Sequence, residues 1–251
     1  MEFDWTVLII VVSFVFVGGF IDAIAGGGGI INMIAFMLCG VPMHYALGTN
    51  KFQSFFGTLT ATINYVRNGH YKKEFVIFSV VGSLVGSLCG AALASMISQN
   101  TLKIMMTIIL PIVAVIILTK VKPKKNLLAA SILKIYVVTL CIGLLIGFYD
   151  GLMGPGTGTF LIIAFSMCGL SLLTSNGNAK IVNLGSNIAS SIYWIFAGKI
   201  LFWLAIPCII ANVIANYIGS RLAIKNGDKL VRPIIIVVLI MLFIKTIYDI
   251  I

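Results

Sequence analysis

Long apolar runs follow one another along the whole chain, separated by short stretches that are polar, basic or rich in glycine. A spanning helix needs about 20 predominantly apolar residues, and most of these runs approach that length without a single charge. The pattern therefore predicts an all-α polytopic membrane protein with about eight full spanning helices. The charge-free runs are residues 5–21, 75–102, 104–119, 135–149, 181–198, 200–220 and 233–244.

Two further apolar pieces, residues 30–39 and 160–168, are too short to span a bilayer. Each follows a glycine-rich stretch and is closed by another glycine, Gly40 or Gly169. At about 1.5 Å per residue, each piece covers about half of the hydrocarbon thickness. We therefore expect two short half-helices at glycine-rich breaks, in addition to the full spans.

The same polar features occur twice, about half the chain apart. Gly-Phe-Ile-Asp ends at Asp22 and Gly-Phe-Tyr-Asp ends at Asp150, 128 positions later. After one inserted residue the shift becomes 129 positions, which relates Lys51 to Lys180. Repeats that contain broken, polar intramembrane segments are typical of secondary transporters, whose site lies where the repeats meet.

We predict one transport domain built from two homologous repeats, residues 1–119 and 129–251, with a basic cytoplasmic loop at 120–128 between them. Lysine and arginine gather in three connections, and such loops stay on the cytoplasmic side. If each short piece changes sides, each repeat makes five crossings, which places all three connections inside and inverts the second repeat. We therefore expect inverted repeats with both termini outside. The basic connections are residues 67–73, 120–125 and 221–232.

Composition narrows the classes of function. Hydrophobic residues make up 60% of the chain and charged residues 10%, with a mean hydropathy of +1.13. A soluble domain would carry about a quarter charged residues. The net charge of +10 is spread over the connections between helices, so it indicates membrane orientation and no nucleic-acid partner. The five cysteines form no Cys-x-x-Cys pair and lie in apolar context, so we expect no metal and no cofactor.

Glycine-rich stretches follow both aspartates and interrupt the predicted helices. Consecutive glycines disfavour a helix by about 1 kcal/mol each, and irregular backbone at membrane depth must line protein or a wet cavity. The helix that restarts there points N–H groups and its positive dipole end at the break, which favours an anion site. Close helix packing is the alternative, and it is the role we expect for Gly82, Gly86 and Gly90. The candidate site residues here are Gly26, Gly27, Gly28, Gly29, Gly154, Gly156, Thr157 and Gly158.

A polar stretch follows each short piece. Lys51 and Ser54 are three residues apart, as are Lys180 and Asn183, so each pair shares one helix face. A cation at hydrocarbon depth is expensive and usually faces a pathway or a partner, whereas the alternative is a lysine that snorkels to the interface. The candidate anion-binding residues on these helices are Asn50, Lys51, Ser54, Asn178, Lys180 and Asn183.

Asp22 and Asp150 are the only acidic residues well inside apolar segments. Desolvation disfavours a charged carboxylate, whereas a nearby lysine favours it, so either residue could carry a coupling proton. Ion pairing with Lys51 or Lys180 and capping of a half-helix are the competing roles. Our slight preference is for structural pairing.

Four stretches resemble the signature segments of the TauE/SafE sulfite exporter family. They are GFIDAIAGGGGIIN at 19–32, ALGTNKFQSFFGTLTATINY at 46–65, GFYDGLMGPGTGTF at 147–160 and NAKIVNLGSNIAS at 178–190. This family, also called the toluene sulfonate uptake permease family, consists of bacterial inner-membrane secondary transporters associated with sulfite, sulfoacetate and other sulfur-containing or organic anions. The resemblance implies a multi-pass inner-membrane transporter of a small sulfur-containing anion, with the glycine loops and Asn/Lys stretches as substrate region.

Two other classes of function use similar residues. An anion channel could employ the same lysines and helix ends. An intramembrane aspartyl protease needs two carboxyl groups close to one water, but such enzymes carry Gly-x-Gly-Asp at the second aspartate, and neither aspartate here lies in that motif. The chain also contains no P-loop, Gly-x-Ser-x-Gly or His-Glu-x-x-His, so we do not expect an enzyme.

Overall fold

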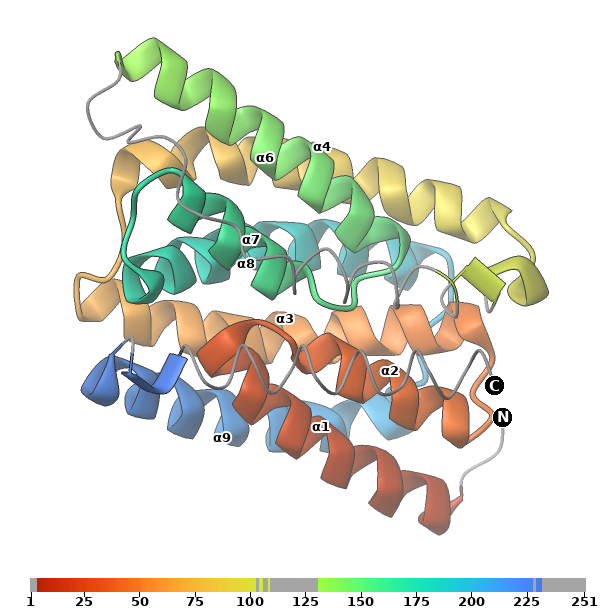
Figure 1. Cartoon of the computed structure of the whole chain (residues 1–251). Coiled ribbons are helices and arrows are strands. Elements are labelled where there is room, and N and C mark those ends of the chain that lie inside the picture. Colours follow the sequence, from red (N-terminus) through yellow and green to blue (C-terminus); the bar gives the residue numbers. More distant parts are fainter. Residues whose placement is uncertain (1–3, 103, 106–107, 109–130, 228, 232–251) are drawn as a thin grey trace.

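The computed structural model describes residues 4–102, 104–105, 108, 131–227 and 229–231, and the regular elements in these ranges are all helices (Figure 1). Most of the spans expected at 104–119 and 233–244, and the loop 120–128, lie outside the described residues. The first half contains α1 (Trp5–Ala25), α2 (Gly28–Leu38), α3 (Met43–Arg67) and α4 (Lys73–Met96). The second half contains α6 (Ile132–Leu152), α7 (Thr157–Met167), α8 (Leu172–Phe196) and α9 (Phe202–Asn226).

Corresponding helices of the two halves have matching lengths. Helices α1 and α6 have 21 residues each, α2 and α7 have 11, and α3 and α8 have 25. The short helices begin earlier than the sequence suggested, because Gly28, Gly29, Thr157 and Gly158 are already helical. The first break is therefore confined to Gly26 and Gly27 and does not extend over all four glycines.

The breaks depend on backbone conformations that favour glycine. Gly26, which ends α1, has a φ of 76°, and Gly156, which precedes α7, has a φ of 83°. Gly154 also has a positive φ, of 90°. A side chain at such a position strains the backbone, so glycine permits the chain to reverse here.

Each short helix doubles back along the long helix before it, so that α1 with α2, and α6 with α7, form hairpins (Figure 1). Val11 near the start of α1 shares a buried cluster with Val41, which follows α2. Ile135 near the start of α6 shares another with Leu170, which follows α7. The glycine breaks therefore form the tips of two hairpins that point into the bundle.

The two halves run in opposite directions. In Figure 1, α1 and α3 run from right to left, whereas α6 and α8 run from left to right. The end of α3 and the end of α9 lie at the same end of the bundle, because Tyr65 shares a buried cluster with Ala223 and Val231. Two of the basic connections, at 67–73 and 221–232, thus begin at one end, and the third lies outside the described residues.

Glycines bring α4 and α6 into close contact. A Cβ on Gly86 would lie 2.2 Å from the carbonyl oxygen of Leu144, and one on Gly90 would lie 2.1 Å from that of Phe148. Gly147 of α6 similarly lies against the backbone of Ser83. The packing role expected for the α4 glycines is confirmed, and it is the small-residue contact typical of membrane helices.

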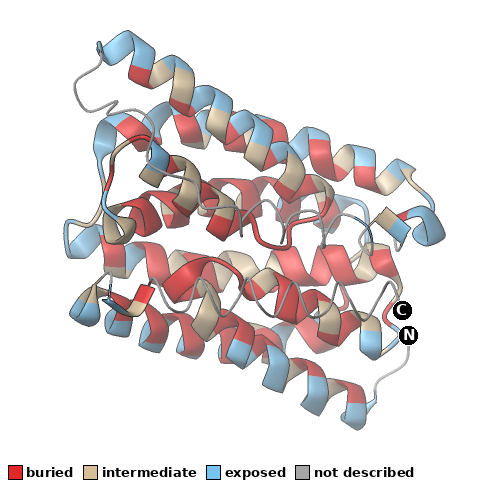
Figure 2. Cartoon of the chain, viewed as in Figure 1, coloured by how far each residue is buried: buried red, intermediate tan, exposed pale blue. Residues whose placement is uncertain are grey.

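Buried residues gather in the interior, around α3 and α8, and exposed residues face outward (Figure 2). Many outward residues are large and apolar, such as Leu145 and Ile210. Within the described residues, α1, α4, α6 and α9 are long and apolar enough to cross a membrane. An apolar exterior around a polar interior is the arrangement expected of a multi-pass membrane protein.

Candidate functional site

The two helix breaks touch each other inside the bundle. The backbone N–H of Thr159 donates to the carbonyl oxygen of Gly26 at 3.2 Å, and its hydroxyl donates to that of Ala25 at 2.8 Å. A Cβ on Gly26 would lie only 2.2 Å from the carbonyl carbon of Gly158. Because Gly26 and Gly158 have no side chains, the tips of the two hairpins can meet.

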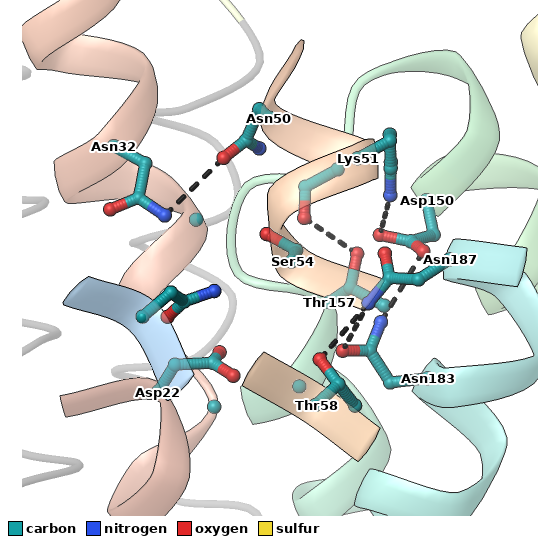
Figure 3. A pocket seen from close by; sticks show the side chains of 15 residues that line it. Asp22, Asn32, Asn50, Lys51, Ser54, Thr58, Asp150, Thr157, Asn183 and Asn187 are labelled. Atoms are coloured by element: carbon teal, nitrogen blue, oxygen red, sulfur yellow. Dashed lines mark hydrogen bonds and ion pairs between the residues drawn. The ribbon is translucent and has the colours of Figure 1, made fainter. Parts of the chain in front are cut away.

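A small polar cavity lies beside this contact (Figure 3). Seven helices and both breaks contribute to its wall, and the first turns of α2 and α7 supply three of the lining residues. N–H groups in the first turn of a helix have no partner within that helix. The lining residues are Asp22, Gly26, Gly29, Asn32, Asn50, Lys51, Ser54, Thr58, Asp150, Gly154, Thr157, Gly158, Asn183, Asn187 and Asn212.

Two ion pairs join the halves of the chain reciprocally. Lys51 of the first half lies 2.6 Å from Asp150 of the second, and Lys180 of the second half lies 2.6 Å from Asp22 of the first. Removing one member of such a buried pair leaves an uncompensated charge, which is strongly destabilising. The pairs therefore hold α3 to α6 and α8 to α1, directly behind the two breaks.

The two carboxylates differ in their surroundings. One oxygen of Asp150 accepts from Lys51, while the other accepts from the hydroxyl of Ser186 at 2.5 Å and the amide of Asn183 at 3.3 Å. Its side chain is 2% exposed, whereas that of Asp22 is 19% exposed. Asp22 accepts from Lys180, and Figure 3 shows its carboxylate projecting toward Thr58 across the cavity.

Amide side chains complete the wall of the cavity. The Asn32 amide donates to the side-chain oxygen of Asn50 at 3.3 Å, which also accepts from Gln53 at 2.9 Å. The Asn187 amide donates to the hydroxyl of Thr58 at 3.1 Å, bridging α8 and α3. These contacts orient donors and acceptors in the buried interior of the protein, where a hydrogen bond is stronger than in water.

The structure brings most of the candidate residues to this cavity. Asp22, Asp150 and nine of the other fourteen candidates line it. Gly27, Gly28 and Gly156 lie in or next to the breaks but are not part of the lining. Lys180 lies behind Asp22, with a side chain that is 1% exposed. The nine lining candidates are Gly26, Gly29, Asn50, Lys51, Ser54, Gly154, Thr157, Gly158 and Asn183.

Asn178 lies elsewhere. Its side-chain oxygen accepts from the backbone N–H of Lys72, in the connection that leads into α4. Its counterpart in the first half, Thr49, accepts in the same way from the N–H of Leu201 ahead of α9. Asn178 therefore holds the start of α4, and Thr49 holds the start of α9. The contact that Asn178 makes is structural, whereas the sequence suggested a substrate ligand.

Four lining residues were not among the candidates: Asn32, Thr58, Asn187 and Asn212. Asn187 belongs to the polar stretch that contains Lys180, which is a signal that sequence reasoning could have used. Asn32 and Asn212 lie in otherwise apolar helices, where an isolated amide is a weaker sign of a lined cavity.

The charged groups of the cavity balance each other. Among the described residues, no group of three His, Cys, Asp or Glu side chains lies close enough to hold a metal ion. Two lysines balance two carboxylates, and the first turns of two helices add partial positive charge. Fold and cavity together define a helical membrane protein with a polar cavity between its halves.

Comparison with known proteins places the chain in a family. Residues 10–246 match the family described as "Sulfite exporter TauE/SafE". A probable membrane transporter protein from Sinorhizobium, ORF9, is 34% identical over 93% of this chain and 90% of its own length. The probable membrane transporter YfcA of Escherichia coli K12 is 31% identical over 92% of this chain and 86% of its own.

A probable membrane transporter of Haemophilus influenzae is likewise 31% identical, over 93% of this chain and 92% of its own length. No solved structure matches the chain. The chain belongs to the TauE/SafE sulfite exporter family, and the expected family is confirmed. It is accordingly a multi-pass membrane transporter and not an enzyme.

Proposed function

We propose that the protein is a secondary transporter of small anions whose substrate site is the cavity beside the two helix breaks. The observation that carries this proposal is that residues from the first turns of α2 and α7 line one cavity together with Lys51. Helix N-termini and a lysine are the groups that bind anions in proteins.

We further propose that the halves are inverted repeats, which would let the site face each side of the membrane in turn. Three observations support this: the matched helix lengths, the opposite directions of α1 and α6, and the reciprocal Lys–Asp pairs. The repeat boundaries at residues 119 and 129, and the loop that connects the repeats between them, are part of the same proposal.

The proposed substrates are small sulfur-containing anions such as sulfite or a sulfonate, carried across the bacterial inner membrane. The name of the matched family supports this class. An oxyanion with several acceptor oxygens also suits a site whose donors converge from two helix starts, a lysine and amides. The names of the relatives give no substrate, so the proposal depends on these two supports.

A binding screen tests the proposal. Purified protein is heated with sulfite, thiosulfate, sulfoacetate, taurine or small carboxylates, because a ligand that binds the folded state raises the unfolding temperature. We expect a sulfur oxyanion to raise it for the native chain and much less for Lys51→Gln. Lys225→Gln, at the exposed end of α9, is the matched control and should behave as the native chain does. No shift with any anion would contradict the proposal.

Transport in liposomes then separates a carrier from a channel of the same architecture. A carrier exchanges labelled for unlabelled substrate at a rate that saturates with concentration. Labelled substrate should therefore accumulate transiently in vesicles loaded with unlabelled substrate. Flux that never saturates and shows no such counterflow would favour the channel instead.

A further inference from the structure

We propose that the anion and one proton bind together, with the proton on Asp22, so that Asp22 couples anion transport to the proton gradient. This inference rests on the proposed anion transport and adds the coupling ion and its site. Asp150, the counterpart in the other half, has a fixed structural role. The following observations distinguish the two aspartates.

Both aspartates line the cavity, but Asp22 is the more exposed and Asp150 the more enclosed. The Asp22 side chain is 19% exposed and accepts from Lys180 through one oxygen. Asp150 is 2% exposed and accepts from three side chains, which occupy both of its oxygens. A proton that arrives from the cavity therefore disturbs one contact at Asp22, whereas at Asp150 it would disturb contacts with three side chains.

The sequence encodes this difference. With the shift of 129 positions, Ser186, which donates to Asp150, corresponds to Gly57, and Asn183 corresponds to Ser54. Gly57 has no side chain to donate, and the Asn212 amide fills the adjacent space, 2.4 Å from where a Cβ would lie. The first half therefore lacks the donor that would hold the Asp22 carboxylate as firmly as its counterpart.

The charged groups around Asp22 allow the binding of an anion to favour the binding of a proton, and the reverse. Lys180 on α8 is its partner, Lys51 and Tyr65 on α3 lie within electrostatic range, and Asp150 on α6 lines the same cavity. Helices α2 and α7 carry no charged residue, and α9 contributes the neutral Asn212 to the lining.

A monovalent anion, such as a sulfonate, that enters this cavity meets the Asp22 carboxylate and adds one negative charge to a balanced set of two lysines and two carboxylates. In a low dielectric, that repulsion is several times stronger than in water. When Asp22 takes a proton from water, its carboxylate becomes a neutral acid and the Lys180 charge is left to balance the anion. The site then holds one anion and one proton with no net change in charge.

This coupling has a direction. Because both ions occupy the same cavity at the same time, they cross the membrane together. A proton gradient directed into the cell would therefore accumulate the anion inside. Coupling between the two sites is reciprocal, so the proton strengthens anion binding as much as the anion strengthens proton binding.

Binding measured across pH tests the inference on the complete chain. Sulfonates such as 2-hydroxyethanesulfonate are suitable probes, because their single negative charge stays fixed between about pH 5 and pH 8, unlike that of sulfite. For the native protein we expect the affinity to fall as the pH rises, by up to about tenfold per pH unit for one proton taken up with each anion. Asp22→Asn, which mimics the protonated acid, should bind the probes with no such pH dependence.

Asp150→Asn is the matched variant, and it should lose stability but keep the slope with pH. A second measurement needs no variant: adding 2-hydroxyethanesulfonate to weakly buffered native protein should remove about one proton from solution per anion bound. Binding without pH dependence or proton uptake would overturn the coupling while leaving anion transport intact. Loss of the slope in Asp150→Asn alone would also overturn it. Failure of every anion to bind would instead remove the proposed function, and this inference with it.

Discussion

Lys51 and Asp150 are almost completely buried, and each is the nearest charged partner of the other. Replacing Asp150 by Asn leaves the lysine as an uncompensated buried cation, so we expect a loss of about 3–5 kcal/mol in unfolding free energy. Denaturant unfolding in detergent measures it. Lys51→Met combined with Asp150→Asn removes both charges and should recover most of the loss. If the double variant is as unstable as the single one, the ion pair is not what stabilises this contact.

Sequence reasoning identified both lysines and both aspartates but left their pairing open. The choice depends on how the two halves are placed, because each lysine pairs with the aspartate of the other half. Comparison of the repeats also missed Asn32, which corresponds to an apolar position near residues 160–161. A polar residue present in only one half gives no repeated signal, so the asymmetry of the site became visible only in three dimensions.

At the scale of the helices, the contact between the breaks depends on the small size of Gly26. Gly26 and Gly69 have nearly the same φ, 76° and 72°, but a Cβ on Gly69 would meet nothing within 4 Å. Alanine at either position carries the strain of a left-handed backbone, about 1–2 kcal/mol. Gly26→Ala must also push the α7 backbone away, so we expect it to lose clearly more stability than Gly69→Ala and to impair anion binding.

Gly69→Ala is thus the control for backbone strain, and the difference between the two variants isolates the collision with Gly158. Thermal unfolding and the anion-induced shift in unfolding temperature measure both effects. Equal losses of stability in the two variants would show that the two breaks can separate without destabilising the protein.

The glycine run also shows why helix bounds are hard to predict. Sequence reasoning set helix breaking against close packing as alternatives for the whole run, yet neighbouring glycines divide the two roles. Gly26 reverses the chain, whereas Gly28 is helical and lies against α1, where a Cβ would be 2.0 Å from the carbonyl oxygen of Gly18. Helix propensity penalises both residues equally, and only the tertiary contact distinguishes them.

For the molecule as a whole, hydropathy was enough to predict a helical membrane protein, and the described residues agree. The short pieces were harder, because their length alone does not say where they lead. In the structure each returns toward the end at which its long partner began. Such a hairpin reverses the direction of the chain once more within each half. Counting each short piece as a change of side had the same effect, and it led to the expectation that the two halves have opposite orientations.

The proposal of inverted repeats can be tested at two equivalent turns, one in each half of the chain. Gly69 follows α3 and Gly198 follows α8, 129 positions later, and both are exposed glycines of positive φ with open space around them. Cysteine should therefore be tolerated equally at both sites in a variant that lacks the five native cysteines. In inverted repeats the two turns lie on opposite sides of the membrane, and we expect Gly69 on the cytoplasmic side because of the basic residues at 67–73.

A thiol reagent that does not cross membranes, added to intact cells, should then label Gly198→Cys and leave Gly69→Cys unlabelled until the cells are opened. Asn226→Cys, at the basic end of α9, should behave like Gly69→Cys because Tyr65 and Ala223 place the two ends together. Labelling of Gly69→Cys and Gly198→Cys from the same side would mean parallel repeats. A parallel arrangement would remove the symmetry by which one cavity could face either side of the membrane.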